Sequence, residues 1–436
     1  RSWFGFGKVS MSMIAGQCLL SAKVQPNSSI LEKSIRSVLI QSMSTQQPLS
    51  ALKIFLIYLR LGCLSFGGPV AHLGYFKEEF VSCRKWLNEP HFAELLALCQ
   101  FVPGPSSSQL GFAIAWQRGG LRGACAAWLG FSLPSALIMI TCAYGLAVSG
   151  DATVPLIHGL LIAAVAVVAK AVLDLGKKLC PDWPRIAIAV GGAALALSIT
   201  GAWIQIGVIL LGVAIGNALF RNISQDKPEL HGAQQLVSKR TMYIALTSFC
   251  VLLAASLLVS PNTNSAIYGM NYRAGAMVFG GGHVVLPLLH DSVVPSGLVS
   301  ESNFLAGYSA AQALPGPLFT LSAFLGTASQ ATSPHWIGGA VALLAIFLPG
   351  MLLLIGLLPL WNTFRNKAWA QAGLIGANAA VVGLLLAALI NPVWAHGVQR
   401  WTDVVLAVGA FIALSRFKIP AWLVVLSCAA CGYLIP

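Results

Sequence analysis

Long apolar segments of helical length dominate the chain, and short polar stretches separate them. None of these segments alternates between apolar and polar residues with a period of two, so they predict helices rather than strands. Most approach the roughly 20 residues that a helix needs to cross a bilayer. We therefore predict an all-α, polytopic membrane protein. The uninterrupted segments cover approximately residues 120–148, 155–174, 186–199, 203–220, 242–260, 337–360, 369–390, 402–415 and 420–435.

Four other apolar regions are interrupted near the middle by paired glycines or by Pro-Gly-Pro. They cover residues 51–76, 92–118, 266–289 and 304–326. A helix break at membrane depth is tolerated only where the backbone is buried in protein or lines a polar cavity. These four breaks are therefore the first candidates for a functional site.

The interruptions belong to motifs that occur twice, in the same order. The two copies of the three motifs lie 213, 212 and 215 residues apart, which predicts that the chain contains a duplication. The pairs are R-x-G-x-x-x-F-G-G at Arg60–Gly68 and Arg273–Gly281, Q-x-x-P-G-P at Gln100–Pro105 and Gln312–Pro317, and Leu-Pro at Leu133–Pro134 and Leu348–Pro349.

Charges in the loops indicate that the two copies are inverted. The first copy carries five Lys and Arg residues in loops between residues 77 and 122, whereas the equivalent loops 290–303 and 327–335 contain none. Because these cations are enriched in cytoplasmic loops, the first loops are predicted to face the cytoplasm and the second the outside. Each Pro-Gly-Pro then forms the tip of a re-entrant hairpin.

This topology divides the chain into four parts. We predict a first repeat at 43–220, a cytoplasmic linker plus an inverting helix at 221–260, and a second, inverted repeat at 261–436. Residues 1–42 are basic and rich in serine, which is typical of a targeting peptide. The alternative is a non-native extension upstream of a natural start at Met43, and the abrupt onset of membrane-type sequence after Met43 favours it.

Composition excludes several classes of protein. Of the residues, 57% are hydrophobic and 9% charged, against about 25% charged in soluble domains, so a soluble enzyme is excluded. The 26 Lys and Arg against 13 Asp and Glu fit the cytoplasmic bias of a membrane protein, and no basic stretch predicts a nucleic-acid partner. The sequence contains no nucleotide-binding motif, zinc-ligand spacing or nucleophile–base arrangement, so we predict no metal, no cofactor and no enzymatic activity.

Arg60 and Arg273 occupy the same position in the two repeats, six residues before Phe-Gly-Gly. A guanidinium in hydrocarbon costs several kcal/mol, so it is retained where it meets an anion, a carboxylate or water. Its five donors suit a tetrahedral oxyanion. We therefore predict that both arginines bind an anionic substrate; the alternative is that each reaches the membrane interface or the C-terminal end of a helix.

The helix breaks provide a second means of binding an anion. A proline ends one helix and is well suited to begin the next, whose N–H groups and positive dipole end then point into the membrane. The glycines would allow close approach of a ligand, and the glutamine and serine side chains would add neutral donors. Proline kinks and glycines that only allow helices to pack are the alternative. The substrate-binding residues predicted in the breaks are Gly67, Gly68, Gln100, Pro103, Gly104, Pro105, Ser106, Ser107, Gly280, Gly281, Gln312, Pro315, Gly316 and Pro317.

Two further side chains are candidates for coupling transport to a proton. Glu94 is an acid in an apolar segment, where it either carries a proton or pairs with Arg60. His72 follows the first glycine break and is either a proton relay or a packing residue. Glu94 and His72 are therefore predicted as coupling residues.

Two stretches of the first repeat closely resemble the chromate ion transporter family: Phe66–Phe76 (F-G-G-P-V-A-H-L-G-Y-F) and Gln100–Gln109 (Q-F-V-P-G-P-S-S-S-Q). Phe279–Gly282 and Gln312–Pro317 resemble the family's second-half motifs, so the resemblance covers about residues 44–436 in the long, two-domain form. It implies a multi-pass protein of the plasma (inner) membrane that moves chromate outward and confers chromate resistance.

The leading hypothesis is a secondary transporter that exports chromate by alternating access at a midplane anion site. The alternative is a transporter or channel for sulfate or another tetrahedral oxyanion, because sulfate shares the shape and charge of chromate. A membrane-embedded enzyme is a third class without a supporting motif. Coupling to a proton, to the membrane potential or to anion exchange stays open, as does assembly into a homo-oligomer.

Overall fold

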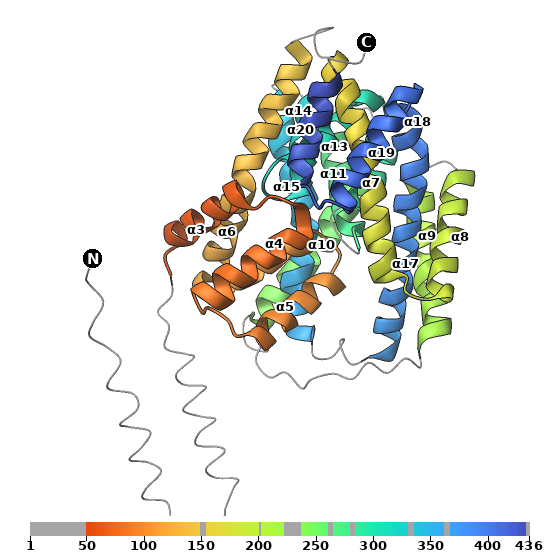
Figure 1. Ribbon diagram of the computed structural model, residues 1–436. Coiled ribbons are helices and arrows are strands. Elements are labelled where there is room, and N and C mark those ends of the chain that lie inside the picture. Colours follow the sequence, from red (N-terminus) through yellow and green to blue (C-terminus); the bar gives the residue numbers. More distant parts are fainter. Residues whose placement is uncertain are drawn as a thin grey trace, which may run out of the picture. The chain divides into compact units, whose positions relative to one another are not determined.

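The structure is a computed structural model and is shown in Figure 1. It describes residues 49–148, 154–199, 202–221, 237–259, 265–279, 284–329, 335–361 and 367–432. The chain divides at Pro48 into two units, and the second, Leu49–Pro436, contains every helix named below. The described residues form helices and no β-strand, which confirms the predicted all-α class. The extension at 1–42 and the glycines Gly280 and Gly281 lie outside the described residues.

The helices of the first half match the predicted segments closely. They are α3 (Ala51–Leu64), α4 (Gly68–Lys77), the π-helical turn η1 (Glu78–Cys83), α5 (Glu89–Phe101), α6 (Ser106–Val148), α7 (Val154–Leu179), α8 (Trp183–Ser198) and α9 (Ala202–Phe220). A connecting helix, α10 (Lys239–Leu258), leads to the second half.

The second half repeats this order with small additions. Its elements are α11 (Ala266–Met277), α12 (Val285–Val293), α13 (Glu301–Ala313), the 3-10 turn η5 (Leu318–Thr320), α14 (Leu321–Ala328), α15 (His335–Leu357), η6 (Leu358–Leu360), α17 (Ala368–Ala388), the π-helical turn η7 (Leu389–Trp394), α18 (Ala395–Gly397), α19 (Trp401–Ser415) and α20 (Ala421–Gly432).

Equivalent helices begin with equivalent caps. The side chain of Asn88 accepts a hydrogen bond from the His91 N–H at the start of α5. Ser300 accepts one from the Asn303 N–H at the start of α13. Such side chains satisfy N–H groups that have no partner within the helix. The helices that lead into the two Pro-Gly-Pro breaks therefore start in the same way in both repeats.

The long helix α6 consists of two helices joined at a kink. Its backbone leaves helical geometry at Gly119 and Gly120, where φ is −146° and 58°. A φ of 58° suits glycine, which has no Cβ to clash. The kink falls between the apolar region predicted at 92–118 and the span predicted at 120–148, so the boundary between these two predicted segments is confirmed.

The second part of α6 and its equivalent, α15, run in opposite directions against each other. The Trp336 N–H donates to the Tyr144 hydroxyl across 3.1 Å, and the rings of Trp128 and Phe347 lie 5.7 Å apart. The second part of α6 and α15 are therefore antiparallel. Because these helices carry the paired Leu-Pro motifs, the two repeats are inverted, as the loop charges predicted.

Helices of each half pack against helices of the other half. Figure 1 shows α17 of the second half beside α8 and α9 of the first, and α7 of the first packs against α19 and α20 of the second. Both packings depend on close backbone approach: a Cβ added to Gly376 would lie 1.9 Å from the Gly212 carbonyl oxygen, and one added to Gly159 would lie 2.2 Å from that of Cys428. Small residues of this kind let membrane helices touch.

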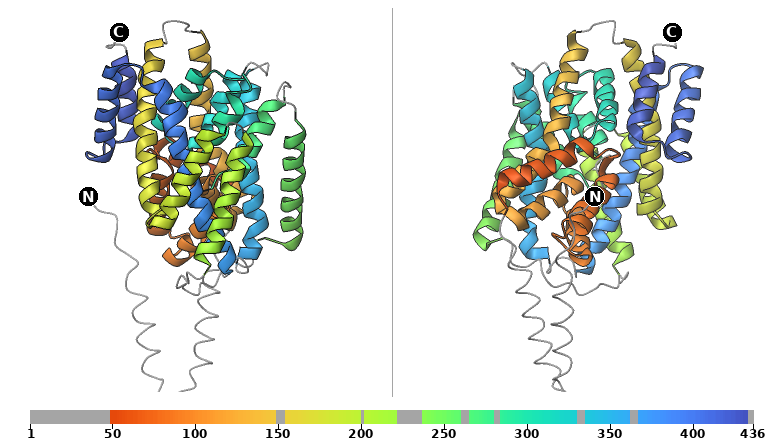
Figure 2. Two further views of the ribbon diagram at one scale, coloured as in Figure 1. Left: turned by 90° about the vertical axis from the view of Figure 1, so that its right-hand side faces the viewer. Right: turned by 60° about the vertical axis from the view of Figure 1, so that its left-hand side comes forward.

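Within the described residues, five helical segments are long and apolar enough to cross a membrane. They are Ser106–Leu146, Pro155–Leu179, Lys239–Leu258, His335–Leu360 and Ala368–Gly397. Figure 2 shows α10 at the edge of the helical bundle, and its apolar segment is only 17% buried. An apolar helix with so little protein around it is suited to face lipid. The protein is therefore a multi-pass membrane protein.

Candidate functional site

The two Pro-Gly-Pro breaks separate helices at equivalent points, α5 from α6 and α13 from η5. Gly104 and Gly316, the central residues, have φ values of +131° and +95°. L-residues with a side chain rarely adopt such values, so glycine is required at each tip. The prolines on either side end one helix and start the next.

Each Pro-Gly-Pro break is hydrogen-bonded to the glycine break of the opposite repeat. The Gly104 N–H donates to the Val278 carbonyl across 2.7 Å, and the Gly316 N–H donates to the Ser65 carbonyl across 3.0 Å. Val278 and Ser65 are equivalent, because each directly precedes the Phe-Gly-Gly of its repeat. All four broken segments therefore meet at one centre.

A cavity of about 820 Å³ lies beside this centre. It is bounded by the starts of α4 and α6, the ends of α5 and α13, and faces of α7, α17 and the α19–α20 connection. Cavities between the halves of inverted-repeat transporters commonly hold the substrate. The predicted substrate-binding residues that line it are Gly67, Gln100, Pro105, Ser106, Ser107, Gln312 and Pro317.

The remaining predicted break residues that the structure describes are not part of the cavity lining. Pro103 and Gly104 support the tip: the Gln109 side chain donates to the Pro103 carbonyl at 3.0 Å and to the Gly350 carbonyl at 2.9 Å. A Cβ on Gly104 would lie 2.9 Å from the Gly350 Cα. Gly68, Pro315 and Gly316 likewise do not line the cavity.

The start of α6 presents donors to the cavity. Ser106 and Ser107 are the first residues of α6 and line the wall. The first N–H groups of a helix have no acceptor within the helix, and they carry its positive dipole end. Gln100 and Gln312, one from each repeat, add amide side chains to the same wall. This part of the cavity is therefore suited to an anion.

His72 does not line the cavity, but it connects the first glycine break to the start of α6. The ring is fully buried, with Nε2 3.2 Å from the Ser65 carbonyl and Nδ1 3.4 Å from the Ser107 hydroxyl. A carbonyl only accepts, so Nε2 carries the proton and Nδ1 accepts from Ser107. The Ser65 carbonyl also accepts from Gly316, so His72 belongs to the contact between the repeats. Its predicted coupling role stays a prediction.

A row of charged side chains on α7 also lines the cavity. Lys170, Asp174 and Lys178 are spaced four residues apart and share one helix face. The Lys170 ammonium lies 2.5 Å from the Asp174 carboxylate. Lys418, in the turn between α19 and α20, also lines the cavity and adopts a positive φ of 54°. Three cations against one carboxylate make this wall electropositive.

The lysines were not among the predicted site residues. The available signal was the four-residue spacing of Lys170, Asp174 and Lys178 at the C-terminal end of an apolar segment. Intramembrane charges aligned on one face are a default indication of a functional surface.

Arg60 and Arg273 do not line the cavity. Arg60 is exposed on α3, and Arg273 donates to the Ser256 carbonyl of α10. The cause is the Arg-x-Gly spacing, because Gly62 packs against α6, where an added Cβ would meet the Phe131 carbonyl oxygen at 2.6 Å. Two residues correspond to about 200° of helix rotation, which directs Arg60 away from that contact.

Glu94 is buried on α5 but does not line the cavity. One of its carboxylate oxygens lies 3.9 Å from Nδ1 of His91, one turn earlier on the same helix. Its predicted role in coupling stays a prediction. Among the described residues, no group of three or more His, Cys, Asp or Glu is placed to hold a metal ion.

Comparisons with known proteins identify the family. A sequence model of the chromate transporter family matches residues 52–217 and 265–433, one match per repeat. The chain is 26% identical to the chromate transport protein of Pseudomonas aeruginosa over 89% of this chain and 93% of that protein. It is 28% identical to an uncharacterized transporter of Methanocaldococcus jannaschii over 88% of this chain and 94% of that protein.

A third relative, the chromate transport protein of Cupriavidus metallidurans, is 26% identical over 80% of this chain and 84% of that protein. No solved structure matches the chain significantly. The family matches cover most of both halves, including the helix breaks that form the cavity wall. The chain therefore belongs to the chromate transporter family, whose members are membrane transporters rather than enzymes.

Proposed function

We propose that this protein exports chromate by alternating access at the cavity between its two repeats. The observation that carries the proposal is that the helix breaks of both repeats meet at one centre, beside a cavity with an electropositive wall. Two relatives named chromate transport protein match most of the chain. Family membership and cavity chemistry thus support the same class of substrate.

The cavity offers a tetrahedral dianion two kinds of partner. Lys170, Lys178 and Lys418 provide positive charge, and the N–H groups at the start of α6, together with the Ser106 hydroxyl, provide hydrogen-bond donors. A hydrogen bond to a charged group contributes about 1.5–3 kcal/mol after the water contacts that it replaces are counted, so each such bond favours binding of the dianion. The same partners suit sulfate, which makes sulfate the competing substrate.

The inverted repeats support alternating access rather than a fixed pore. In inverted-repeat transporters one half rocks against the other around a central site. Here the bonds from Gly104 to Val278 and from Gly316 to Ser65 cross between the repeats at the tips of the breaks. A change in one break is therefore expected to move its counterpart.

Outward transport agrees with the electrical driving force. An inside-negative potential contributes about 2.3 kcal/mol per elementary charge for each 100 mV. Export of a dianion therefore gains roughly 4.6 kcal/mol per 100 mV. The membrane potential alone is then a sufficient energy source for moderate chromate gradients.

The test is labelled chromate accumulation in a chromate-sensitive bacterium that expresses the chain. We expect lower accumulation and better survival than in cells with an empty vector, and competition by excess sulfate if the two dianions share the site. Unchanged accumulation, with the protein shown to be in the membrane, would reject chromate export. Saturation and counterflow in proteoliposomes separate a carrier from a pore, which shows neither.

A further inference from the structure

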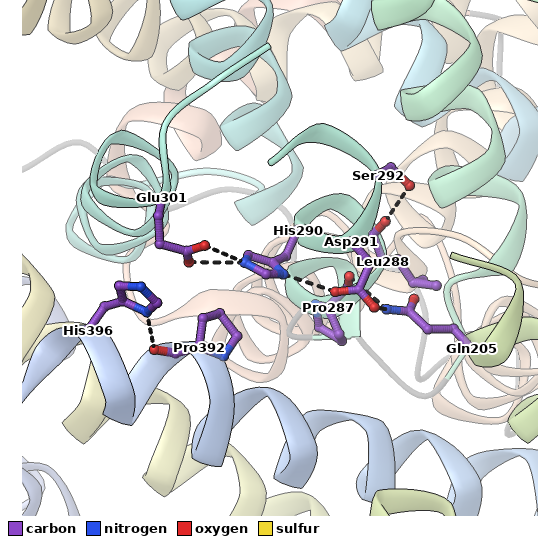
Figure 3. Close-up of polar contacts among 9 residues, drawn as sticks. All are labelled: Gln205, Pro287, Leu288, His290, Asp291, Ser292, Glu301, Pro392 and His396. Atoms are coloured by element: carbon purple, nitrogen blue, oxygen red, sulfur yellow. Dashed lines mark hydrogen bonds and ion pairs between the residues drawn. The ribbon is translucent and has the colours of Figure 1, made fainter. Parts of the chain in front are cut away.

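A histidine and two carboxylates form a compact cluster at the α12–α13 connection, away from the cavity wall. Nδ1 of His290 lies 2.9 Å from the Asp291 carboxylate, and Nε2 lies 2.9 Å from the Glu301 carboxylate. Figure 3 shows the ring between the two acids. Both ring nitrogens contact groups that only accept when ionised, so the geometry suits an imidazolium with a proton on each nitrogen.

The cluster also joins the two repeats. The side chain of Gln205, at the start of α9 in the first repeat, donates to the Asp291 carboxylate at 2.5 Å and to the Pro287 carbonyl at 2.9 Å. Asp291 and Pro287 belong to α12 of the second repeat, and Glu301 begins α13. One imidazolium thus holds α12 to α13, and Asp291 extends the connection to α9.

The first repeat has an equivalent ion pair with a different cation. The Lys77 ammonium, at the end of α4, lies 2.9 Å from the carboxylate of Glu89, the first residue of α5. His290 follows Lys77 by 213 residues and Glu301 follows Glu89 by 212, the spacing of the other paired motifs. Because the repeats are inverted, the two pairs belong to opposite faces of the membrane. Lysine stays charged through the physiological range, whereas histidine can titrate.

The surroundings of His290 keep its proton bound. Burial alone opposes the charge, but hydrogen bonds and charge from Asp291 and Glu301 outweigh burial and raise its pKa from 6.5 to about 9. Of the helices packed against α12, the described residues of α9 and α17 contribute no charged group. On α11, Arg273 donates to Ser256. His396, which is also drawn in Figure 3, contacts the Pro392 carbonyl and not the His290 cluster.

We propose that the His290 cluster is a proton-dependent clamp that keeps its face of the transporter closed. The equivalent Lys77–Glu89 pair keeps its charges through the same pH range and is therefore not a pH-dependent clamp. The raised pKa of His290 determines whether the closed state gains or loses stability as the pH rises. A group that binds its proton more tightly in the closed state stabilises that state fully below pH 6.5 and ceases to do so as the pH rises through about 9. Alkaline conditions at this face therefore release α12 from α13.

The consequence for transport rests on the proposed function, so the first test measures the clamp without transport. Amide hydrogen exchange of residues 284–305 is measured for the full chain in lipid nanodiscs at pH 6.5 and at about 9.5, with correction for base-catalysed exchange. We expect corrected exchange to increase by roughly tenfold or more in the wild type. The His290→Lys variant, which copies the first repeat, should exchange slowly at both values.

Two other variants complete this test. His290→Gln keeps a polar side chain but cannot hold the charge, so at pH 6.5 it should exchange as the wild type does at alkaline pH. Lys77→His should introduce pH-dependent exchange at residues 77–91, which the wild type lacks. Equal corrected exchange of the wild type and His290→Gln at pH 6.5, or an alkaline increase that persists in His290→Lys, would overturn the clamp.

The second test uses the transport of labelled chromate in proteoliposomes. Wild-type flux should rise as the pH on the His290 face passes from neutral to about 9, and His290→Lys should remove that dependence. An identical pH profile in the two proteins would contradict the clamp. If the wild type moves no anion at any pH but the exchange pattern appears, the transport proposal fails and the clamp stands.

Discussion

The amide of Gly104 donates a hydrogen bond to the carbonyl of Val278 across 2.7 Å, which joins the Pro-Gly-Pro break of the first repeat to the glycine break of the second. The bond from Gly316 to Ser65 makes the reciprocal connection across 3.0 Å. Each repeat therefore completes the backbone hydrogen bonding of the other at the point where its own helices stop. Isolated repeats would leave these groups without their partners, at a cost that membrane proteins rarely accept.

Substitution of Gly104 by alanine is expected to destabilise the protein and to abolish transport. Its φ of +131° is strained for any L-residue with a side chain, and the new Cβ would lie 2.9 Å from the Gly350 Cα. Backbone strain of this kind costs about 1–3 kcal/mol, before any clash. Thermal unfolding in nanodiscs measures the loss.

A glycine with room around it provides the control. Gly191 lies within α8, and a Cβ added there meets nothing within 4 Å. Alanine at this position should leave stability unchanged or raise it by up to about 1 kcal/mol, because alanine favours a helix more than glycine does. Equal effects of the two substitutions would contradict the role of Gly104.

Loss of the Lys170 charge is expected to weaken chromate binding. Lys170→Gln removes one cation from the cavity wall and keeps a side chain of similar length. A charged hydrogen bond of about 1.5–3 kcal/mol corresponds to a roughly 10- to 100-fold rise in the KM for chromate uptake into everted vesicles. Lys177→Gln is the matched control, since Lys177 is on the same helix but does not line the cavity. A KM unchanged in Lys170→Gln would exclude this wall as the anion site.

Much of the architecture could be predicted from the sequence because lipid imposes simple constraints. A helix that crosses a bilayer needs a long apolar segment, and a break in such a segment needs protein or a polar cavity around it. The apolar segments, the paired motifs and the loop charges therefore indicated the helices, the duplication and the inversion. The lining positions of Gln100 and Gln312 also followed from their place beside the breaks.

The source of positive charge could not be predicted in the same way. Paired motifs indicate which residues are equivalent, but the rotation of each helix decides which side chains reach the centre. In α3 the face that carries Gly62 packs on α6, so Arg60 lies on the far side. The charged face of α7 has no equivalent in the second repeat, where α17 contains no charged residue. Symmetry between the repeats therefore does not indicate Lys170.

The arginines provide a direct test of the two interpretations. If Arg60 binds the substrate, as the sequence predicted, alanine at this position would abolish transport. Its exposed position on α3 predicts instead a flux within about twofold of the wild type. Arg273→Ala should instead lower the thermal stability, because it leaves the Ser256 carbonyl without its donor. Chromate flux and melting temperature of both variants are the measurements. Abolished flux in a stable Arg60→Ala protein would restore the arginine to the substrate path.

Opposite orientation of the two repeats is expected to appear in chemical labelling. Cys83 is exposed at the end of η1, close to the Lys77–Glu89 pair, and Ser302 is exposed at the start of α13, close to His290. In a background without other cysteines, an impermeant maleimide added to intact cells should label Ser302→Cys and leave Cys83 unmodified. Cys83 should react only after the cells are permeabilised. Because both positions are exposed in the structure, labelling of both from the same side would contradict the inverted topology. It would also contradict the assignment of the His290 cluster and the Lys77–Glu89 pair to opposite faces.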